Sequence, residues 1–267
     1  MPTFIAFMIG FVVPFGLGIY LSFCKFTTIK DAVPVGFANY VGIFQDEGFI
    51  HALWYTTLFA IVSVITINIL GFAIAMLLTK GIRGTNFFRT IFFMPNLIGG
   101  IVLGYIWQLI LNGILDRFGL TLTFSEVYGF WGLIILMNWQ QIGYMMIIYI
   151  AGIQNVPPEL IEAAKIDGAN GRQILANVIL PIVMPSITIC TFLTLTNSFK
   201  LFDQNLALTN GLPGSRSELL ALNIYNTFYG RVGFEGVGQA KAVCFSLIVG
   251  AIAIMQLFST HKKEVQQ

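Results

Sequence analysis

The chain has 267 residues, of which 57% are hydrophobic and only 10% charged, and its mean hydropathy is +0.82. A soluble domain carries about 25% charged residues, so this composition excludes an ordinary soluble protein and indicates a lipid bilayer as partner. The net charge is +2 and the longest basic run is Lys262-Lys263, a pattern that gives no indication of nucleic acid. Three widely spaced cysteines and two distant histidines predict no metal site and no cofactor.

Six charge-free stretches are each about long enough to cross a hydrocarbon core of ~30 Å as a helix. They run from Thr3 to Cys24, Ala52 to Thr79, Thr90 to Leu115, Val127 to Gly152, Ile182 to Phe199 and Ala242 to His261. They are continuous apolar runs without the alternation of a barrel strand. The first could be a secretory signal, but no basic residue precedes it and no small-x-small cleavage site follows. We therefore expect an all-α integral membrane protein with six transmembrane helices.

These stretches divide the chain into an N-terminal helix with its outer loop at 1–51, a transmembrane domain at 52–260 and a short tail at 261–267. Within the third stretch, Gly100-x-x-x-Gly104 places two small residues on one helix face, which is typical of helix contacts in membranes. Pro95 is expected to kink the same helix near its start.

The connection from Lys80 to Arg89 has three basic residues and no acidic residue, which favours the cytoplasmic side. With six helices, both termini then lie inside. Over all connections, however, the 14 basic residues divide equally between the two sides, so the charge rule alone does not decide the orientation.

The outer connection, Lys200 to Lys241, is unusually long, and loops of that length are usually functional or disordered. Ser215-x-x-Glu218 has the form of a capping box and precedes an apolar segment, Leu219 to Tyr229, that stops at Gly230. We expect a short amphipathic helix on the outer face. It would serve either as a lid on the bundle or as a docking surface for an external partner.

The inner connection, 153–181, is predicted to form a helix-turn-helix outside the membrane. Pro157-Pro158 presets the first turn of a helix, and Gly168 supplies a residue able to end it. A second helix is expected over Gly171 to Ile179, ended by Pro181. Such a loop is either an interfacial helix in the headgroup layer or a docking knob for a partner.

A motif in this loop resembles the EAA loop of permease subunits of binding-protein-dependent ABC importers. It consists of Glu162-Ala163-Ala164, then Gly168, then Val178-x-Leu180-Pro181, with Val where Ile is commoner. Further segments are similar to the carbohydrate-uptake branch, and to its maltose/multiple-sugar F-type subunit in particular. These are Phe92-Phe93-Met94-Pro95-Asn96, Gly104-x-x-Trp107, Ser198-Phe199-Lys200-x-Phe202-Asp203 and Leu208-Thr209-Asn210-Gly211-x-Pro213. The chain departs from the family at Leu212, where Gly is usual, and in lacking a basic lead-in before Thr3.

The resemblance implies a type I ABC importer permease fold in a bacterial cytoplasmic membrane and no catalytic residues. It also implies a homologous G-type permease as partner, two cytoplasmic ATP-binding subunits, an extracytoplasmic sugar-binding protein and an oligosaccharide as substrate. The residues that would couple to the ATPase are Glu162, Ala163, Ala164, Asp167, Gly168, Leu180 and Pro181. No Lys follows a Gly in this chain, so it has no Gly-x4-Gly-Lys phosphate loop and is not itself the ATPase.

A secondary sugar transporter is the alternative of a different class. Such transporters usually place ionisable residues within the membrane, and none of the six predicted stretches contains an acidic or basic residue before the terminal His261.

A neutral sugar is bound by aromatic faces and uncharged hydrogen-bonding groups. The fourth and fifth stretches offer such side chains as candidates for the substrate path: Asn138, Trp139, Gln141, Tyr144, Asn197 and Phe199. The neighbouring Gln140 has the same chemistry. Amides in membrane helices also serve as contacts between helices, so both interpretations stay open for each residue.

Overall fold

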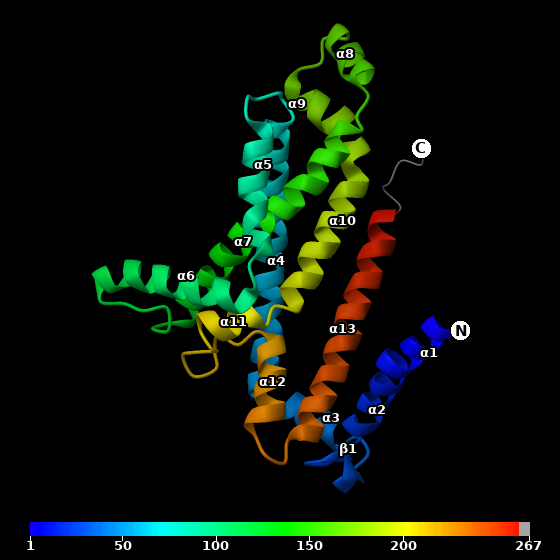
Figure 1. The fold of residues 1–267 in the computed structure, drawn as a ribbon, viewed down its shortest axis with the longest axis vertical. Coiled ribbons are helices and arrows are strands. Elements are labelled where there is room, and N and C mark those ends of the chain that lie inside the picture. Colours follow the sequence, from blue (N-terminus) through cyan, green and yellow to red (C-terminus); the bar gives the residue numbers. More distant parts are fainter. Residues whose placement is uncertain (262–267) are drawn as a thin grey trace.

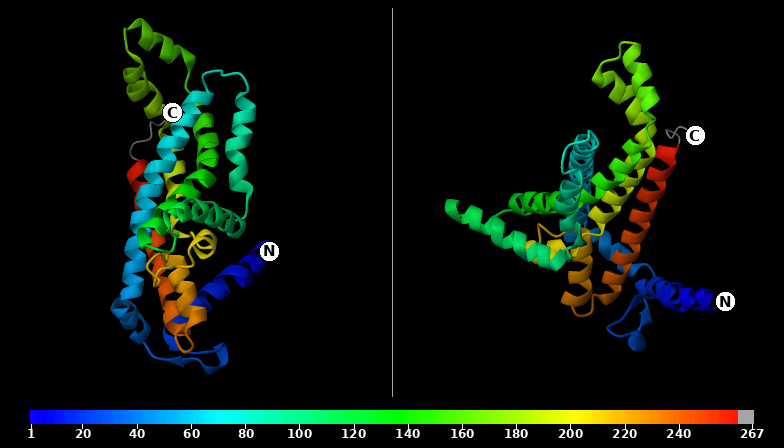
Figure 2. Two further views of the ribbon diagram at one scale, coloured as in Figure 1. Left: turned by 90° about the vertical axis from the view of Figure 1, so that its left-hand side faces the viewer. Right: turned by 45° about the horizontal axis from the view of Figure 1, so that its top comes forward.

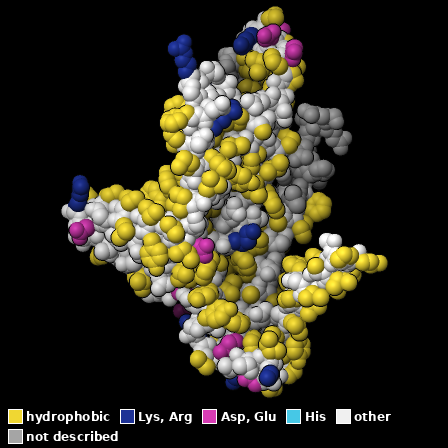
Figure 3. Space-filling view, viewed as in Figure 1, with side chains coloured by type: hydrophobic (Ala, Val, Ile, Leu, Met, Phe, Trp, Pro, Cys, Tyr) yellow, Lys and Arg dark blue, Asp and Glu magenta, His cyan; other side chains and the backbone are white. Residues whose placement is uncertain are grey.

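The computed structural model describes residues 1–261, which form an elongated bundle of helices (Figure 1). Within these residues, six helical segments are long and apolar enough to cross a membrane, as the sequence predicts. They cover Pro2–Ser22, Glu47–Leu78, Gly100–Phe118, Glu126–Gln154, Gly171–Phe199 and Glu235–Gln256. Figure 3 shows hydrophobic side chains over the long helices and most charged side chains toward the ends. Residues 262–267, most of the predicted tail, lie outside the described part.

The N-terminal segment stands apart from the bundle. It comprises α1 (Pro2–Phe7), a π-helical turn (Met8–Val12) and α2 (Val13–Ser22), and α2 packs against α13 (Glu235–His261). Most side chains of this segment are exposed and apolar, so it requires a hydrocarbon environment or a partner. In Figure 2 it projects from the side of the bundle opposite to α6 (Gly100–Leu115).

A small outer structure follows α2. It consists of a two-stranded antiparallel hairpin and the short helix α3. The bounds are β1 (Cys24–Lys25), a 3₁₀ turn (Ile29–Asp31), β2 (Val33–Pro34) and α3 (Ala38–Gln45). The buried Asn39 side chain donates hydrogen bonds to the carbonyl oxygens of Ser22 and Cys24, both at 2.9 Å. These bonds hold α3 against the end of α2 and the start of the hairpin.

Three long helices form the core of the bundle: α4 (Glu47–Leu78), α7 (Glu126–Gln154) and α10 (Leu180–Phe199). Gly71 of α4 brings that helix close to α7, because a Cβ there would lie 3.3 Å from the Cβ of Met145. Gly152 of α7 similarly faces Ser186 of α10. Tyr149 is buried between these helices and donates a 2.6 Å hydrogen bond to Asn68 Oδ1. Close backbone approach and polar contacts thus hold the three helices together.

The third predicted helix, Thr90 to Leu115, is not one helix, and this expectation was wrong. The chain forms α5 (Thr85–Phe93) and a 3₁₀ turn (Met94–Leu97), and then starts α6 at Gly100. In Figure 1, α5 runs beside α4, whereas α6 lies across the bundle. Pro95 lacks an N–H, and Gly99 is extended at φ −60° and ψ 140°, so the helical hydrogen bonds stop here. Pro95 therefore takes part in a break rather than a kink.

Two close backbone contacts stabilise this break. The Phe92 carbonyl packs directly on Gly143 of α7, where no side chain could fit. Gly100 and Gly104 of α6 face α11 (Asp203–Leu208), and a Cβ at Gly104 would lie 2.6 Å from the Cβ of Ala207. The small-residue face predicted from the sequence is therefore a helix contact, and its partner is the short helix α11.

The inner connection contains α8 (Pro158–Ile166), α9 (Gly171–Ile174) and a π-helical turn (Leu175–Ile179). The first helix begins and ends as predicted, but the prediction that Pro181 ends the second was wrong. The chain stays helical from Gly171 through the π turn into α10, and Pro181 lies in the first turn of α10. The wider π turn directly before Pro181 accommodates a residue that cannot donate a backbone hydrogen bond.

The outer connection contains α11 and α12 (Leu220–Gly230). The predicted amphipathic helix is present, but the predicted capping box is not. Ser215 has a positive φ of 63°, and Leu219 is the N-cap residue. The Glu218 carboxylate is instead buried and accepts hydrogen bonds from the side-chain amides of Asn223 and Asn226, both at 2.9 Å. Hydrogen bonds from these two amides of α12 thus take the place of the predicted local cap.

Candidate functional site

The helix-turn-helix of the inner connection projects beyond the upper end of the bundle in Figure 1. A Schellman motif ends α8: the Gly168 N–H donates to the Lys165 carbonyl at 3.1 Å, and the Ala169 N–H to the Ala164 carbonyl at 2.9 Å. Gly168 has φ +81°, a conformation that residues with a Cβ adopt at a cost. The turn geometry therefore depends on this glycine.

The start of α9 is equally defined. Asn170 Oδ1 accepts hydrogen bonds from the backbone N–H groups of Arg172 and Gln173, and Gln173 Oε1 accepts one from the Asn170 N–H. This reciprocal capping box joins the two helices without a flexible linker. Ile174 is buried in the core of the bundle, so α9 is anchored to it.

The seven predicted coupling residues separate into two groups. Glu162, Ala163, Asp167 and Gly168 are exposed on α8 and its turn, whereas Ala164, Leu180 and Pro181 are half-buried. Ala164 packs against the core together with Ile161. Ile166, which the sequence interpretation did not single out, is 86% exposed at the end of α8. This apolar side chain lies beside two acidic residues and is accessible to a partner.

A cavity of about 270 Å³ lies where α7, α10 and α11 meet, and we name it the central cavity. Its walls are formed by Met137, Gln141, Asn197, Lys200, Leu201, Phe202, Asp203 and Gln204. Gln141 and Asn197 were predicted path residues, and the structure brings them together. The Gln141 Oε1 atom is buried without a hydrogen-bond partner among the described residues, so it is available to a ligand that can donate a hydrogen bond.

The other predicted path residues have different surroundings. Asn138 is buried and donates to Thr66 Oγ1 at 3.0 Å and to the Ile134 carbonyl at 2.8 Å, so it joins α7 to α4. Trp139 is 44% exposed, and its ring contacts that of Trp107 on α6 with centroids 5.7 Å apart. Tyr144 packs against the core and Phe199 is buried. None of these four is among the lining residues of the cavity.

The other six cavity residues were not on the predicted list: Met137, Lys200, Leu201, Phe202, Asp203 and Gln204. Four of them, Lys200 to Asp203, belong to the segment Ser198 to Asp203, whose sequence is similar to the sugar branch. Gln204 Nε2 donates to Gln140 Oε1 at 2.9 Å, and Gln140 Nε2 donates to the Ile98 carbonyl at 3.3 Å. The amide pair therefore connects α11, α7 and the break before α6.

The segment after α11 is held by one buried asparagine. Asn205 Nδ2 donates to the Ser217 carbonyl at 2.8 Å, and Asn205 Oδ1 accepts from the Leu219 N–H at 2.8 Å. Ser217 in turn donates to the Leu212 carbonyl at 2.6 Å. The Leu208 to Pro213 motif therefore forms part of a loop that places α11 next to α12.

A buried charge cluster lies on the outer side and was missed by the sequence interpretation. The last helix begins at Glu235 rather than Ala242, so Lys241 lies inside a membrane-crossing segment and is 0% exposed. Its ammonium donates to Asp46 Oδ2 at 2.6 Å, Asn223 Oδ1 at 2.9 Å and Thr227 Oγ1 at 2.8 Å. The expectation that no membrane span contains an ionisable residue was wrong. The helical turns from Glu235 to Lys241, which precede the charge-free stretch, are apparent only in the structure.

The carboxylate of this cluster is held ionised. Burial alone would raise the pKa of Asp46, but the hydrogen bond and charge of Lys241 and the N–H groups of Phe49 and Gly48 keep that pKa below its ordinary value. Asp46 is also the N-cap of α4. The cluster thus joins the start of α4 to α12 and α13.

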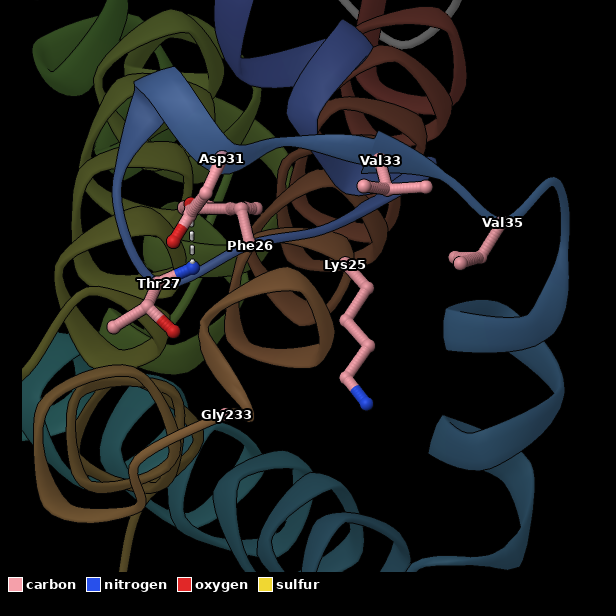
Figure 4. Close-up of a pocket in the computed structure, with 7 residues that line it drawn as sticks. All are labelled: Lys25, Phe26, Thr27, Asp31, Val33, Val35 and Gly233. Atoms are coloured by element: carbon pink, nitrogen blue, oxygen red, sulfur yellow. Dashed lines mark hydrogen bonds between the residues drawn. The ribbon is translucent and has the colours of Figure 1, made fainter.

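A second cavity, of about 370 Å³, lies on the outer side between the β1–β2 hairpin and Gly233 (Figure 4). Its carboxylate, Asp31, accepts hydrogen bonds from the N–H groups of Thr27 at 3.1 Å and Thr28 at 2.7 Å. These bonds lower the pKa of Asp31 below its ordinary value. Because both bonds serve the turn, this cavity is a product of the hairpin geometry and not a site built around a free carboxylate.

Comparisons with known proteins agree with this architecture. A family model described as "Binding-protein-dependent transport system inner membrane component" matches residues 67–260. The chain is 43% identical over 274 residues to the probable starch degradation products transport system permease protein AmyD of Thermoanaerobacterium thermosulfurigenes, with coverage of 99% of this chain and 93% of that protein. It is 30% identical to the multiple sugar-binding transport system permease protein MsmF of Streptococcus mutans, with coverage of 97% and 92%.

A solved structure shares the fold. It is the crystal structure of a bacterial ABC transporter involved in the import of the acidic polysaccharide alginate, and it superposes with a TM-score of 0.83 at 20% identity. The match covers 98% of this chain and 93% of that one. The type I importer permease fold expected from the sequence is confirmed.

Proposed function

Because the chain belongs to the family of inner membrane components of binding-protein-dependent transport systems, we propose that it forms half of the membrane path of an ATP-driven importer of neutral oligosaccharides. The observation that carries this proposal is the likeness over nearly the whole chain to permeases named for starch degradation products and multiple sugars. The cavity at Gln141 and Asn197 supports it, since neutral amides suit a hydroxylated ligand.

In this proposal the chain works with other subunits. A homologous permease of the G type completes the path. Two cytoplasmic ATPase subunits bind the complex, one at α8 of this chain and one at the corresponding helix of the partner permease. An extracytoplasmic protein delivers the sugar. The exposed Ile166, Ala163 and Glu162 on α8 support an ATPase contact. The surface of α8 is accessible, partly apolar and acidic, which suits contact with another protein. Hydrolysis of ATP would require a phosphate-binding loop, so we assign it to the partner subunit.

Coupling between the two sites would run through one continuous helical segment. From Gly171 to Phe199 the chain is helical for 29 residues, which is roughly 40 Å at 1.5 Å per residue. The N-terminal end of this segment follows the capped turn after α8. Asn197, near its C-terminal end, lines the central cavity. A tilt imposed on α8 would therefore move a cavity wall directly. We propose this movement as the step that opens and closes the path around the sugar.

Reconstitution tests this function. The chain, its partner permease, the ATPases and the binding protein are placed in proteoliposomes, and uptake of maltose and of a longer linear maltodextrin is measured. We expect uptake to need both ATP and the binding protein and to persist when ion gradients are collapsed. Uptake that stops with the ion gradient and continues without ATP would favour the secondary transporter instead.

The cavity assignment is tested in the same assay by Gln141→Leu with Asn138→Leu as its comparison. Gln141→Leu is expected to lower uptake of both sugars at least about tenfold while the protein accumulates normally, because a ligand contact is lost. Asn138→Leu is expected to lower the amount of protein in the membrane, because it removes a contact between α7 and α4. If Gln141→Leu transports like the parent, the cavity is not the path.

A further inference from the structure

An aromatic groove adjoins the central cavity on its outer side. Phe202 lines both the cavity and the groove. From Phe202, ring contacts continue along α12, with centroids 5.0 Å apart to Tyr225 and a further 4.9 Å to Tyr229. We name Phe202, Tyr225 and Tyr229 the aromatic strip. It forms a connected path of rings from the polar cavity toward the outer end of α12.

The two tyrosines of the strip lie on the exposed face of α12. Tyr225 and Tyr229 are 42% and 72% exposed, although Leu222 and Thr227 on the same helix are buried. The two tyrosines are four residues apart and therefore lie on one face of α12. The opposite face fixes the helix to the bundle, in part through the hydrogen bonds that Lys241 donates to Asn223 and Thr227. The open face is thus held in place by contacts that do not involve the tyrosines.

The groove itself is mostly apolar with a few polar tips. Its volume is about 340 Å³, within the range of small-molecule sites, and Ala221, Ile224 and Ala242 contribute to its walls. Gly238 allows α13 to approach, because a Cβ there would lie 2.8 Å from the Cβ of Phe228. Polar groups come from the tyrosine hydroxyls and from the Gln239 amide. Flat rings with polar tips match a ligand that has one apolar face and a hydroxylated rim.

We propose that the aromatic strip binds the trailing sugar rings of an oligosaccharide whose leading ring occupies the central cavity. This rests on the function proposed above and adds a second binding site to it. A pyranose ring carries its C–H groups on its faces and its hydroxyls around the edge, which fits stacking on Tyr225 and Tyr229 with hydrogen bonds at the tips. The shared residue Phe202 supports a sugar chain over a lipid tail, since it connects the groove to a polar cavity.

The test uses the reconstituted importer with its binding protein and ATPases, and compares maltose with a longer linear maltodextrin. Tyr225→Leu and Tyr229→Leu keep apolar bulk but remove the flat ring. We expect each to raise the KM for the long maltodextrin roughly three- to tenfold, while the KM for maltose changes less than about twofold. Tyr225→Phe and Tyr229→Phe retain the ring but lose the hydroxyl, so each should raise the KM for the long maltodextrin less than the matching Leu variant does.

Phe44→Ala is the control, since Phe44 is 71% exposed on α3 and is not among the lining residues of the groove, and it should change neither KM. The proposal is overturned if the Leu variants transport the long sugar like the parent, or if they lose both sugars together with co-purification of the partner permease. The latter result would make the strip a subunit interface. A parent that transports neither sugar would instead refute the proposed function itself.

Discussion

Lys241 lies at the centre of a buried polar cluster that joins three helices. A buried ammonium is tolerated here because Asp46, Asn223 and Thr227 satisfy its three hydrogen bonds. The Phe49 ring adds a contact, with Lys241 Nζ 5.4 Å from the ring centroid. Such a cluster does little for net stability compared with apolar packing, but removing one member leaves the others unpaired.

Lys241→Met should therefore destabilise the protein by about 3 kcal/mol, because Asp46 is left without its counter-charge. The measurement is thermal unfolding in detergent. Lys30→Met, at an exposed lysine of the hairpin turn, is the control and should change stability little. In a double-mutant cycle, Asp46→Asn combined with Lys241→Met should cost clearly less than the sum of the two single changes. Additive costs would show that the pair does not interact.

The pH dependence of this cluster follows from Asp46. Its pKa is lowered in the folded protein, so the unfolded chain takes up the proton first as the pH falls. The stabilising contribution is thus complete above the unfolded pKa, about 4, and is lost as the pH falls through the lower folded pKa. Between pH 5 and 8 the Asp46 contribution should stay constant.

Gly168 acts through its backbone and not through a close contact. A Cβ at this position would meet nothing within 4 Å, but φ is +81°. We expect Gly168→Ala to strain the Schellman turn by about 1 kcal/mol and to lower sugar-stimulated ATP hydrolysis, with Gly168→Asn less affected because Asn tolerates this conformation. Gly171→Ala is the control, since Gly171 also has open space but begins a helix. Equal activity of Gly168→Ala and Gly171→Ala would contradict this account.

At the scale of elements, we propose that α8 and the helical segment Gly171 to Phe199 move as one unit. The Asn170 capping box fixes its angle, and Ile174 fixes its base in the core. The π turn before Pro181 lets the helix continue where proline would otherwise interrupt it. Because a hydrogen-bonded turn joins α8 to the helical segment that leads into α10, a movement of α8 should be transmitted to the cavity.

The exposed end of α8 gives a direct test of its role. Ile166→Asp should lower co-purification of the ATPase subunit at least about tenfold, because a charge is placed where an apolar contact is expected. Insertion into the membrane should remain normal, since Ile166 is 86% exposed. Ala176→Trp, at an exposed alanine outside α8, serves as the control. An Ile166→Asp variant that still binds the ATPase would argue for an interfacial helix instead.

At the scale of the whole molecule, the helix-turn-helix and the α5 end lie at one end of the bundle, and α12 with the hairpin at the other (Figure 1). We expect the first end to lie in the cytoplasm, because the short connection between Lys80 and Arg89 is basic. In a background without the three native cysteines, Asn86→Cys should react with a membrane-impermeant thiol reagent only after cells are opened. Ser215→Cys should react in intact cells. The reverse pattern would invert the orientation and remove α8 from the ATPase side.

Local features of the sequence determined much of this protein. Apolar length predicted the six membrane segments, because each must match the hydrocarbon core. Pro157-Pro158 and Gly168 predicted the limits of α8, because their effects on backbone angles need no distant partner. The motif around Glu162 led to the importer family, which the comparisons support.

Contacts between distant segments decided the rest. The break in the third membrane segment is stabilised by a distant contact, because Gly143 on another helix allows the Phe92 carbonyl to pack against it. Glu218 forms no local cap and instead accepts hydrogen bonds from two side-chain amides of α12. Lys241 is buried because α4, α12 and α13 converge on it. The cavity at Gln141 likewise needs α11 to fold back against α7, through Gln204 and Gln140. Propensity and pattern act over a few residues, whereas these arrangements depend on partners up to about two hundred residues away, so only the tertiary structure could select them.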